Sequence, residues 1–166
     1  MASLKKIVPC LWFDNQAEEA AKFYVSIFEG SRIGSISRYT EAGHEVHQRP
    51  AGSVMTVEFE LQGQPFTALN GGPLFKFSEA ISLQVMCESQ EEIDRYWSKL
   101  SAGGDDRAQQ CGWLKDKFGL SWQVAPTMLT KVFVDADPVK AGRVMNAMLK
   151  MKKFDIAQLK RAYEGK

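Results

Sequence analysis

The chain alternates apolar and polar residues at the spacing of a β-strand in several stretches, most clearly over residues 53–61. Successive side chains of a strand point to opposite sides of the sheet, so this alternation predicts one face under a helix and one face without such cover. Over residues 53–61 the apolar set is Met55, Val57, Phe59 and Leu61, and the polar set is Thr56, Glu58 and Glu60.

Further strands are predicted on both sides of this one. In the first half they cover residues 5–13, 32–39 and 66–70, and in the second half residues 81–87, 107–110, 112–115 and 120–125. Gln62-Gly63-Gln64 and the stretch from Asp116 to Gly119 have the composition of tight turns. Residues 40–52 are polar and predict a loop.

An amphipathic helix follows the first strand of each half, and the two helices match at an offset of 73 residues. At this offset Glu18 falls on Glu91, Phe23 on Tyr96 and Gly30 on Gly103. Asn15 and Ser89 are the predicted N-caps. Similarity at a fixed offset indicates a duplicated unit, so the predicted pattern is βαβββ, twice.

The alternation also assigns residues to the two faces of each sheet. On the helix side we predict Pro9, Leu11, Phe13, Ile81, Leu83, Val85 and Cys87, and on the opposite side Cys10, Trp12, Ser82, Gln84 and Met86. Trp122 shares its face with Leu120 and Val124 and is predicted in the core. A polar and aromatic face that curves into a cup is suited to binding a small molecule.

Residues 127–166 predict a helical hairpin. A helix over residues 139–152 begins after Asp137 and Pro138, and a shorter helix over residues 156–163 is capped by Asp155. The predicted apolar stripe of the first helix is Val144, Met145, Met148, Leu149 and Met151. The hairpin could dock on its own domain or on a neighbouring subunit. The predicted organisation is therefore residues 1–126 as one domain, with modules at 1–75 and 76–126, and residues 127–166 as an extension.

Composition excludes several classes of protein. The 166 residues are 45% hydrophobic and 25% charged, which is typical of a folded chain, and the formal net charge is +1. A charge so close to zero predicts neither a nucleic acid nor a membrane as partner. No apolar run reaches the length of a membrane span, and no secretory signal is evident. The cysteines, Cys10, Cys87 and Cys111, form no CxxC pair, so we expect buried free thiols in a reducing cytoplasm.

Four motifs resemble one known family. They are PCLWFDNQAEEAAKFY at residues 9–24, LNGG at 69–72, ISLQVMCESQEEIDRYW at 81–97 and CGWLKDKFGLSWQVAP at 111–126. Together with the paired βαβββ pattern, they are similar to the PhnB-like branch of the vicinal oxygen chelate superfamily. That superfamily contains glyoxalase I, extradiol dioxygenases, and bleomycin and fosfomycin resistance proteins. The resemblance covers about residues 5–126 and extends into the tail, and members of this branch often carry the label 3-demethylubiquinone-9 3-methyltransferase.

The resemblance implies where a metal-dependent member would hold its ion, on the first and last strands of each module. Those positions here offer Gln84 and Gln123 in the second module and, in the first, Val8, Cys10 or Trp12 with Thr67 or Asn70. A divalent ion normally needs carboxylate or imidazole ligands, which this set lacks. We therefore expect no tightly bound metal and no other cofactor, with Glu58 and Glu60 as the carboxylates that could still hold an ion.

Each further candidate has a structural alternative. His44 and His47 could form a general base, a metal pair or a pH-sensitive lid, or could simply be solvated. Glu58 could be a general acid or base, or a solvated carboxylate. Asn70 could present its amide to a ligand or serve the glycine turn that follows it. The catalytic candidates are thus Glu58, His44 and His47. The predicted ligand-binding residues are Trp12, Thr56, Glu58, Asn70, Ser82, Gln84, Trp113 and Gln123.

The sequence predicts an α+β protein in which two βαβββ modules form a curved mixed sheet, with a C-terminal helical hairpin. We expect it to bind an apolar or aromatic organic molecule in a cup, as a homodimer, and to be either a binding protein or an enzyme that turns this molecule over. The alternatives are a metal-dependent lyase or dioxygenase and a non-catalytic drug-sequestering protein. A methyltransferase is disfavoured, because no glycine-rich turn follows a first strand as in the common S-adenosylmethionine enzymes.

Overall fold

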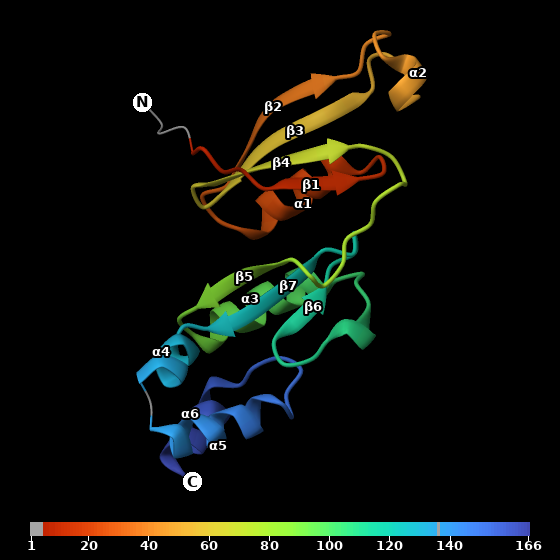
Figure 1. The fold of residues 1–166 in the computed structure, drawn as a ribbon. Helices are drawn as coiled ribbons and strands as arrows, with labels where there is room; N and C mark the ends of the chain where they lie inside the picture. Colours follow the sequence, from red (N-terminus) through yellow and green to blue (C-terminus); the bar gives the residue numbers. More distant parts are fainter. Residues whose placement is uncertain (1–4, 136) are drawn as a thin grey trace. The chain divides into compact units, whose positions relative to one another are not determined.

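The computed structural model describes residues 5–135 and 137–166. The chain divides into two compact units, Met1–Lys76 (unit 1) and Phe77–Lys166 (unit 2) (Figure 1). Among the described residues, none of the helices has the length and apolar character needed to cross a bilayer.

Unit 1 is a four-stranded sheet with one long helix against it. Its elements are β1 (Cys10–Phe13), α1 (Ala17–Ile27), β2 (Arg32–Arg38), α2 (His44–His47), β3 (Val54–Leu61) and β4 (Gln64–Asn70). The strand order is β1-β4-β3-β2, in which β1 runs parallel to β4 and the other neighbours are antiparallel. Helix α1 covers one face of this sheet (Figure 1).

The alternation in the sequence gives unit 1 its core, as predicted. Leu11, Phe13, Val57 and Phe59 are buried on the helix side, where the ring of Phe59 stacks with that of the fully buried Tyr24 of α1. Burying each such side chain stabilises the fold by about 1.5–3 kcal/mol. The predicted turn between β3 and β4 is also confirmed, because Gln62 and Gly63 have the positive φ angles, 47° and 82°, that a two-residue hairpin needs.

Unit 2 repeats this arrangement with one strand fewer. Its elements are β5 (Ser82–Cys87), α3 (Gln90–Ser101), the 3-10 helix η1 (Asp106–Ala108), β6 (Trp113–Lys115), β7 (Ser121–Pro126), α4 (Met128–Asp135), α5 (Pro138–Met148) and α6 (Ile156–Glu164). The strand order is β5-β7-β6, with β5 parallel to β7. In both units the first strand pairs in parallel with the last, and α1 and α3 begin 73 residues apart.

The prediction of a strand over residues 107–110 is wrong. Asp105 accepts hydrogen bonds from the backbone N–H and the guanidinium of Arg107, and the chain turns into η1 instead of extending. A carboxylate that bonds to its neighbours' N–H groups competes with strand pairing in this way. At the end of this stretch, one isolated β-bridge joins Gln110 to Trp113.

Three smaller predictions also fail. Asn15 does not cap α1, whose N-cap residue Gln16 makes no side-chain capping bond, whereas Ser89 caps α3 as predicted. Ile81 precedes β5 and is 71% exposed, so it is not on the helix side. Cys10 is exposed because its side of β1 has no helix over it, so only Cys87 of the three free cysteines is fully buried.

The C-terminal residues form three helices where two were predicted. Helix α4 follows β7 directly, and α5 ends at Met148, earlier than expected. Asp137 and Asp155 cap α5 and α6 as predicted. Arg143 donates to the carbonyls of Ala162 and Tyr163 and so joins α5 to the end of α6. The predicted apolar stripe of α5 is only partly buried, since Val144 and Met151 are inside whereas Met145 and Leu149 are exposed.

Main-chain hydrogen bonds attach the segment between α5 and α6 to unit 2. The N–H groups of Cys111 and Gly112 donate to the carbonyls of Met151 and Lys152, both at 2.8 Å. The ring of Phe154 lies so close to Gly112 that a Cβ there would overlap it. The C-terminal segment is therefore packed into unit 2.

The turn before β7 is held by one buried carboxylate. Asp116 is 2% exposed and accepts hydrogen bonds from the backbone N–H groups of Phe118 and Leu120 and from the indole N–H of Trp122, at 2.8, 3.1 and 2.9 Å. Trp122 is buried in the core, as predicted. The carboxylate thus satisfies three donors that would otherwise lose their bonds to water.

Replacing Asp116 with Ala should lower the free energy of unfolding by about 2–4 kcal/mol, because three buried donors lose their acceptor. Urea denaturation of the variant and the parent chain measures this difference. Asp106→Ala, which removes an exposed carboxylate of the same region, should change the midpoint little. Equal midpoints for the Asp116 variant and the parent chain would contradict the role given to this carboxylate.

Candidate functional site

The face of the unit 1 sheet that α1 leaves uncovered is here called open face 1. Strand register places its residues in rows that run across the sheet. One row joins Trp12, Leu69 and Thr56, the next joins Cys10, Thr67 and Glu58, and the third joins Pro65 and Glu60. The sequence alternation predicted the facing of Trp12, Thr56 and Glu58 correctly.

Strand β2 supplies hydroxyl groups to this face. The Ser35 hydroxyl donates to the Glu58 carboxylate at 2.5 Å, and the hydroxyls of Ser37 and Thr56 are 2.5 Å apart. At the edge of the face Arg32 forms an ion pair with Glu60 at 3.1 Å. Within the described residues Glu58 has no such cationic partner at hydrogen-bond distance. On this face its carboxylate is therefore more available to a ligand than that of Glu60.

A β-bulge creates space above Glu58. Ile33 pairs with Phe59 and Ile36 with Val57, so two residues of β2, Gly34 and Ser35, oppose Glu58 alone. Gly34 has no side chain there, and an added Cβ would lie 3.2 Å from the Glu58 carbonyl oxygen. The resulting hollow has a volume of about 540 Å³ and includes Lys5, Arg32, Glu58 and Thr67 in its lining.

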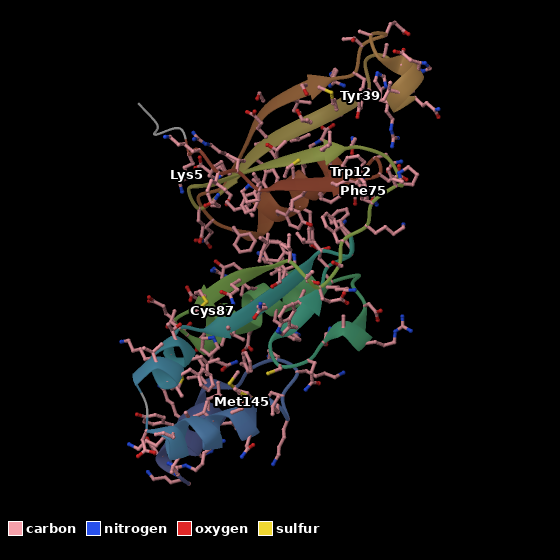
Figure 2. The ribbon with its side chains drawn as sticks, viewed as in Figure 1. Lys5, Trp12, Tyr39, Phe75, Cys87 and Met145 are labelled. Carbon is pink, nitrogen blue, oxygen red and sulfur yellow. The ribbon has the colours of Figure 1, made fainter. Side chains whose placement is uncertain are left out.

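Aromatic rings mark the other end of open face 1. The indole N–H of Trp12 donates to the carbonyl of Gly72 at 2.8 Å, and the ring of Phe75 meets the indole edge-on at 4.9 Å. Gly71 leaves no room for a side chain beside this indole. Figure 2 shows Trp12 and Phe75 together, with Lys5 at the opposite end of the unit. Open face 1 is therefore charged at one end and aromatic at the other.

Asn70 has a structural role in this unit. Its side-chain oxygen accepts from the N–H of Ala17 at 2.8 Å, and its NH₂ group donates to the carbonyl of Val54 at 3.0 Å. Its own carbonyl accepts from the hydroxyl of Tyr39. Asn70 thus satisfies the start of α1, which Asn15 was predicted to do, and its amide is already engaged within unit 1.

The two histidines lie on the single turn of α2. Ring nitrogen Nδ1 of His47 accepts from the N–H of Arg49, and Nε2 faces the carbonyl of Ala42 at 3.2 Å. The ring also packs against Tyr39 at 4.5 Å. His44 is exposed, and its ring centre is 5.8 Å from that of His47. Both nitrogens of His47 therefore have local partners that hold this turn in place.

The uncovered face of the unit 2 sheet, here called open face 2, carries neutral polar groups. The Gln123 amide donates to the hydroxyl of Ser82 at 2.8 Å, and the Gln84 amide reaches the Gln123 oxygen at 3.5 Å. Trp113 pairs with Gln123 across β6 and β7. Ser82, Gln84, Trp113 and Gln123 are therefore neighbours on one face, which the alternation predicted for Ser82, Gln84 and Gln123.

The donor set does not fit a divalent metal ion. The described residues contain no group of three or more His, Cys, Asp or Glu side chains that could hold one. Open face 2 offers a hydroxyl and two amides, and open face 1 has Glu58 without a second free carboxylate beside it, because Glu60 is paired with Arg32. Neutral oxygens alone offset little of the cost of dehydrating such an ion.

Sequence reasoning missed four contributors to open face 1: Gly34, Ser35, Ser37 and Phe75. The alternation in β2 could have identified Ser37, since this residue faces Thr56. Alternation could not have identified Ser35. A bulge places this residue opposite Glu58 together with Gly34, and a strict period of two does not predict a bulge.

The fold defines a class of protein: paired units in which one helix covers one face of a small mixed sheet, as in the glyoxalase and bleomycin resistance superfamily. Within this class, the chain belongs to the family described as 3-demethylubiquinone-9 3-methyltransferase, whose model matches residues 5–125. A search of curated proteins finds no match. The resemblance expected from the motifs is therefore confirmed at the level of the family.

Solved structures agree with this assignment. The PhnB protein from Bacillus cereus is 39% identical, with a TM-score of 0.62 over 74% of this chain and 100% of that one. Protein PA1353 from Pseudomonas aeruginosa is 21% identical, with a TM-score of 0.56 over 75% and 98%. The fosfomycin resistance protein FosX from Listeria monocytogenes, complexed with Mn(II) and sulfate, is 14% identical, with a TM-score of 0.52 over 79% and 97%. The last two similarities show the fold alone.

The cysteines provide a test of the two faces of the sheets. Burial raises the pKa of Cys87 to about 11, with a smaller contribution from Glu92, so its thiol stays protonated below that pH in the folded chain. Cys10 is exposed on open face 1. At pH 8 iodoacetamide should therefore modify Cys10 first and should reach Cys87 only after unfolding, because the thiolate is the reactive form.

Peptide mass mapping at successive times measures these rates. A Cys10→Ser variant identifies the fast site, and urea provides the unfolded reference in which all three thiols should react at similar rates. Modification of Cys87 in the folded chain as fast as that of Cys10 would contradict the assigned faces.

Proposed function

We propose that the chain binds a small organic molecule with an apolar or aromatic part on the open faces of its sheets, without a tightly bound metal. The observation that supports this most is open face 1, which has no helix over it and combines a hollow of about 540 Å³ with polar and aromatic groups. Concave sites with a few placed polar groups are typical of small-molecule binding.

The spacing of the rows on open face 1 suggests the size of the ligand. Two residues along a strand span about 7 Å, so the row of Glu58 and the row of Trp12 are separated by the length of a one-ring or two-ring molecule. A ligand of that size would place its polar group near Glu58 and the Ser35 hydroxyl and its ring near Trp12 and Phe75. Glu58 would then be the general acid or base if a reaction follows.

Open face 2 would add neutral hydrogen bonds. We propose that Ser82, Gln84, Gln123 and Trp113 are the ligand-binding groups of open face 2, and that the active form is a cytoplasmic homodimer. Amide and hydroxyl groups both donate and accept, so they suit carbonyl or hydroxyl groups of a ligand.

Methyl transfer is not part of this proposal. The glycine pairs of the chain have other roles here, since Gly71 gives room to the indole of Trp12 and Gly103 follows the end of α3. Neither pair forms the turn between a first strand and a helix that holds the cofactor in doubly wound S-adenosylmethionine enzymes.

A screen of aromatic and apolar compounds by thermal shift tests the proposal, because a ligand that binds only the folded chain raises its melting temperature. Compounds that bind open face 1 should no longer raise the melting temperature of the Thr67→Tyr variant. The larger side chain would occupy the hollow beside Glu58. Tyr is readily accepted in strands, so the variant should remain folded.

Thr130→Tyr, which places the same side chain at an exposed position of α4, is the matched control and should keep the ligand shift. Ligand shifts that persist unchanged in Thr67→Tyr would contradict the proposed site. Shifts abolished by EDTA would favour the metal-dependent lyase or dioxygenase. A bound compound recovered unchanged after long incubation would favour the sequestering protein over the enzyme.

A further inference from the structure

The formal charge of +1 conceals an uneven distribution along the chain. Residues 127–166, here called the extension, contain nine Lys and Arg against four Asp and Glu, a formal charge of +5. The other 126 residues contain twelve against sixteen, a formal charge of −4. The extension lies just beyond residues 5–125, the range that the family model matches. A charge asymmetry of this kind points to an anionic partner.

Most of the basic side chains in the extension are exposed and unpaired. Lys153 is paired with Asp94 and Lys166 with Glu164, and Arg143 is used between α5 and α6. Within the described residues, the other exposed cations form no ion-pair contact; they are Lys131, Lys140, Lys150, Lys152, Lys160 and Arg161. Of these, Lys140 lies over the ring of Tyr163, 5.0 Å from its centre. Asp137 and Asp155 cap α5 and α6, and the formal charge of +5 already includes their carboxylates.

Apolar side chains accompany these charges at the surface. Val134 is 77% exposed, Val139 66% and Leu149 56%. On α5 the buried Val144 marks the inner side, and at about 100° per residue Val139, Asn146 and Leu149 point roughly 140–160° away from it. The outer side of α5 therefore carries an apolar residue at each end, Val139 and Leu149. Lys150 and Lys152 come just after Leu149 in the chain.

We infer that the extension binds an anionic phospholipid surface, with the outer side of α5 and the exposed end of α4 in the interface. Lysines beside exposed aliphatic side chains match a surface that offers phosphate groups above a hydrocarbon layer. A nucleic acid would account for the lysines, but it leaves Val134, Val139 and Leu149 in water. The lipid surface accounts for both kinds of side chain.

This inference is independent of the proposed ligand site. None of the residues assigned to the ligand belongs to the extension. It also replaces the expectation, drawn from the net charge of the whole chain, that no membrane surface is a partner. Binding of this kind is peripheral and requires no helix that crosses the bilayer.

Co-sedimentation of the full chain with vesicles tests the inference. Vesicles of phosphatidylcholine with about 30% phosphatidylserine should bind the chain at least tenfold more strongly than phosphatidylcholine alone, and added salt should weaken the binding. Lys150→Glu with Lys152→Glu should reduce binding about tenfold or more. The Lys152 carbonyl that accepts from Gly112 belongs to the main chain, so the fold is retained.

The matched control is Lys76→Glu with Lys99→Glu, which reverses the charge at two exposed lysines outside the extension. This variant should change vesicle binding less than twofold relative to the parent chain. Val139→Ser with Leu149→Ser should also weaken binding. Circular dichroism verifies that each variant is folded. The inference is overturned by equal binding to both kinds of vesicle, by absence of binding, or by an equal loss in the control. Tighter binding to a DNA duplex, unaffected by Val139→Ser with Leu149→Ser, would overturn it in favour of a nucleic acid.

Discussion

Each sheet of this protein has one long amphipathic helix packed on one of its two faces. This packing determines which side chains of each strand are buried and which are left on the open face. A helix can bury only one face of a sheet, so the apolar residues of every strand must alternate with residues that tolerate water. In unit 1 the buried face holds Phe13, Val57 and Phe59 beneath α1. The polar and aromatic groups therefore collect on the other face, where a ligand can reach them.

The sequence was sufficient wherever one local rule decided the outcome. Strict alternation over β3 identified which side chains face the helix, and the repeat at an offset of 73 residues located both α1 and α3. Side-chain caps were found where the cap is local, as for Ser89 and Asp155. These features depend on residues close together in the chain, which is the range over which sequence patterns are informative.

Features that depend on distant residues could not be predicted. Asn70 satisfies the start of α1 from β4, 53 residues away in the chain, so the local candidate Asn15 was chosen wrongly. The bulge that brings Ser35 and Gly34 to Glu58 is a property of strand pairing. The buried role of Asp116 depends on Trp122 and on the turn between β6 and β7. The net charge of the whole chain also concealed the basic extension, which only a count by segment reveals.

The division of the unit 1 sheet into a buried and an open face is tested most directly by cysteine scanning along β3 in a Cys10→Ser background. Glu58→Cys should react with a thiol reagent in the folded chain at a rate typical of an exposed thiol, and Thr56→Cys, at a half-buried position, should react more slowly but still before unfolding. Val57→Cys, which lies between them and is 0% exposed in the parent, should react only after unfolding. Equal rates at all three positions in the folded chain would contradict the account.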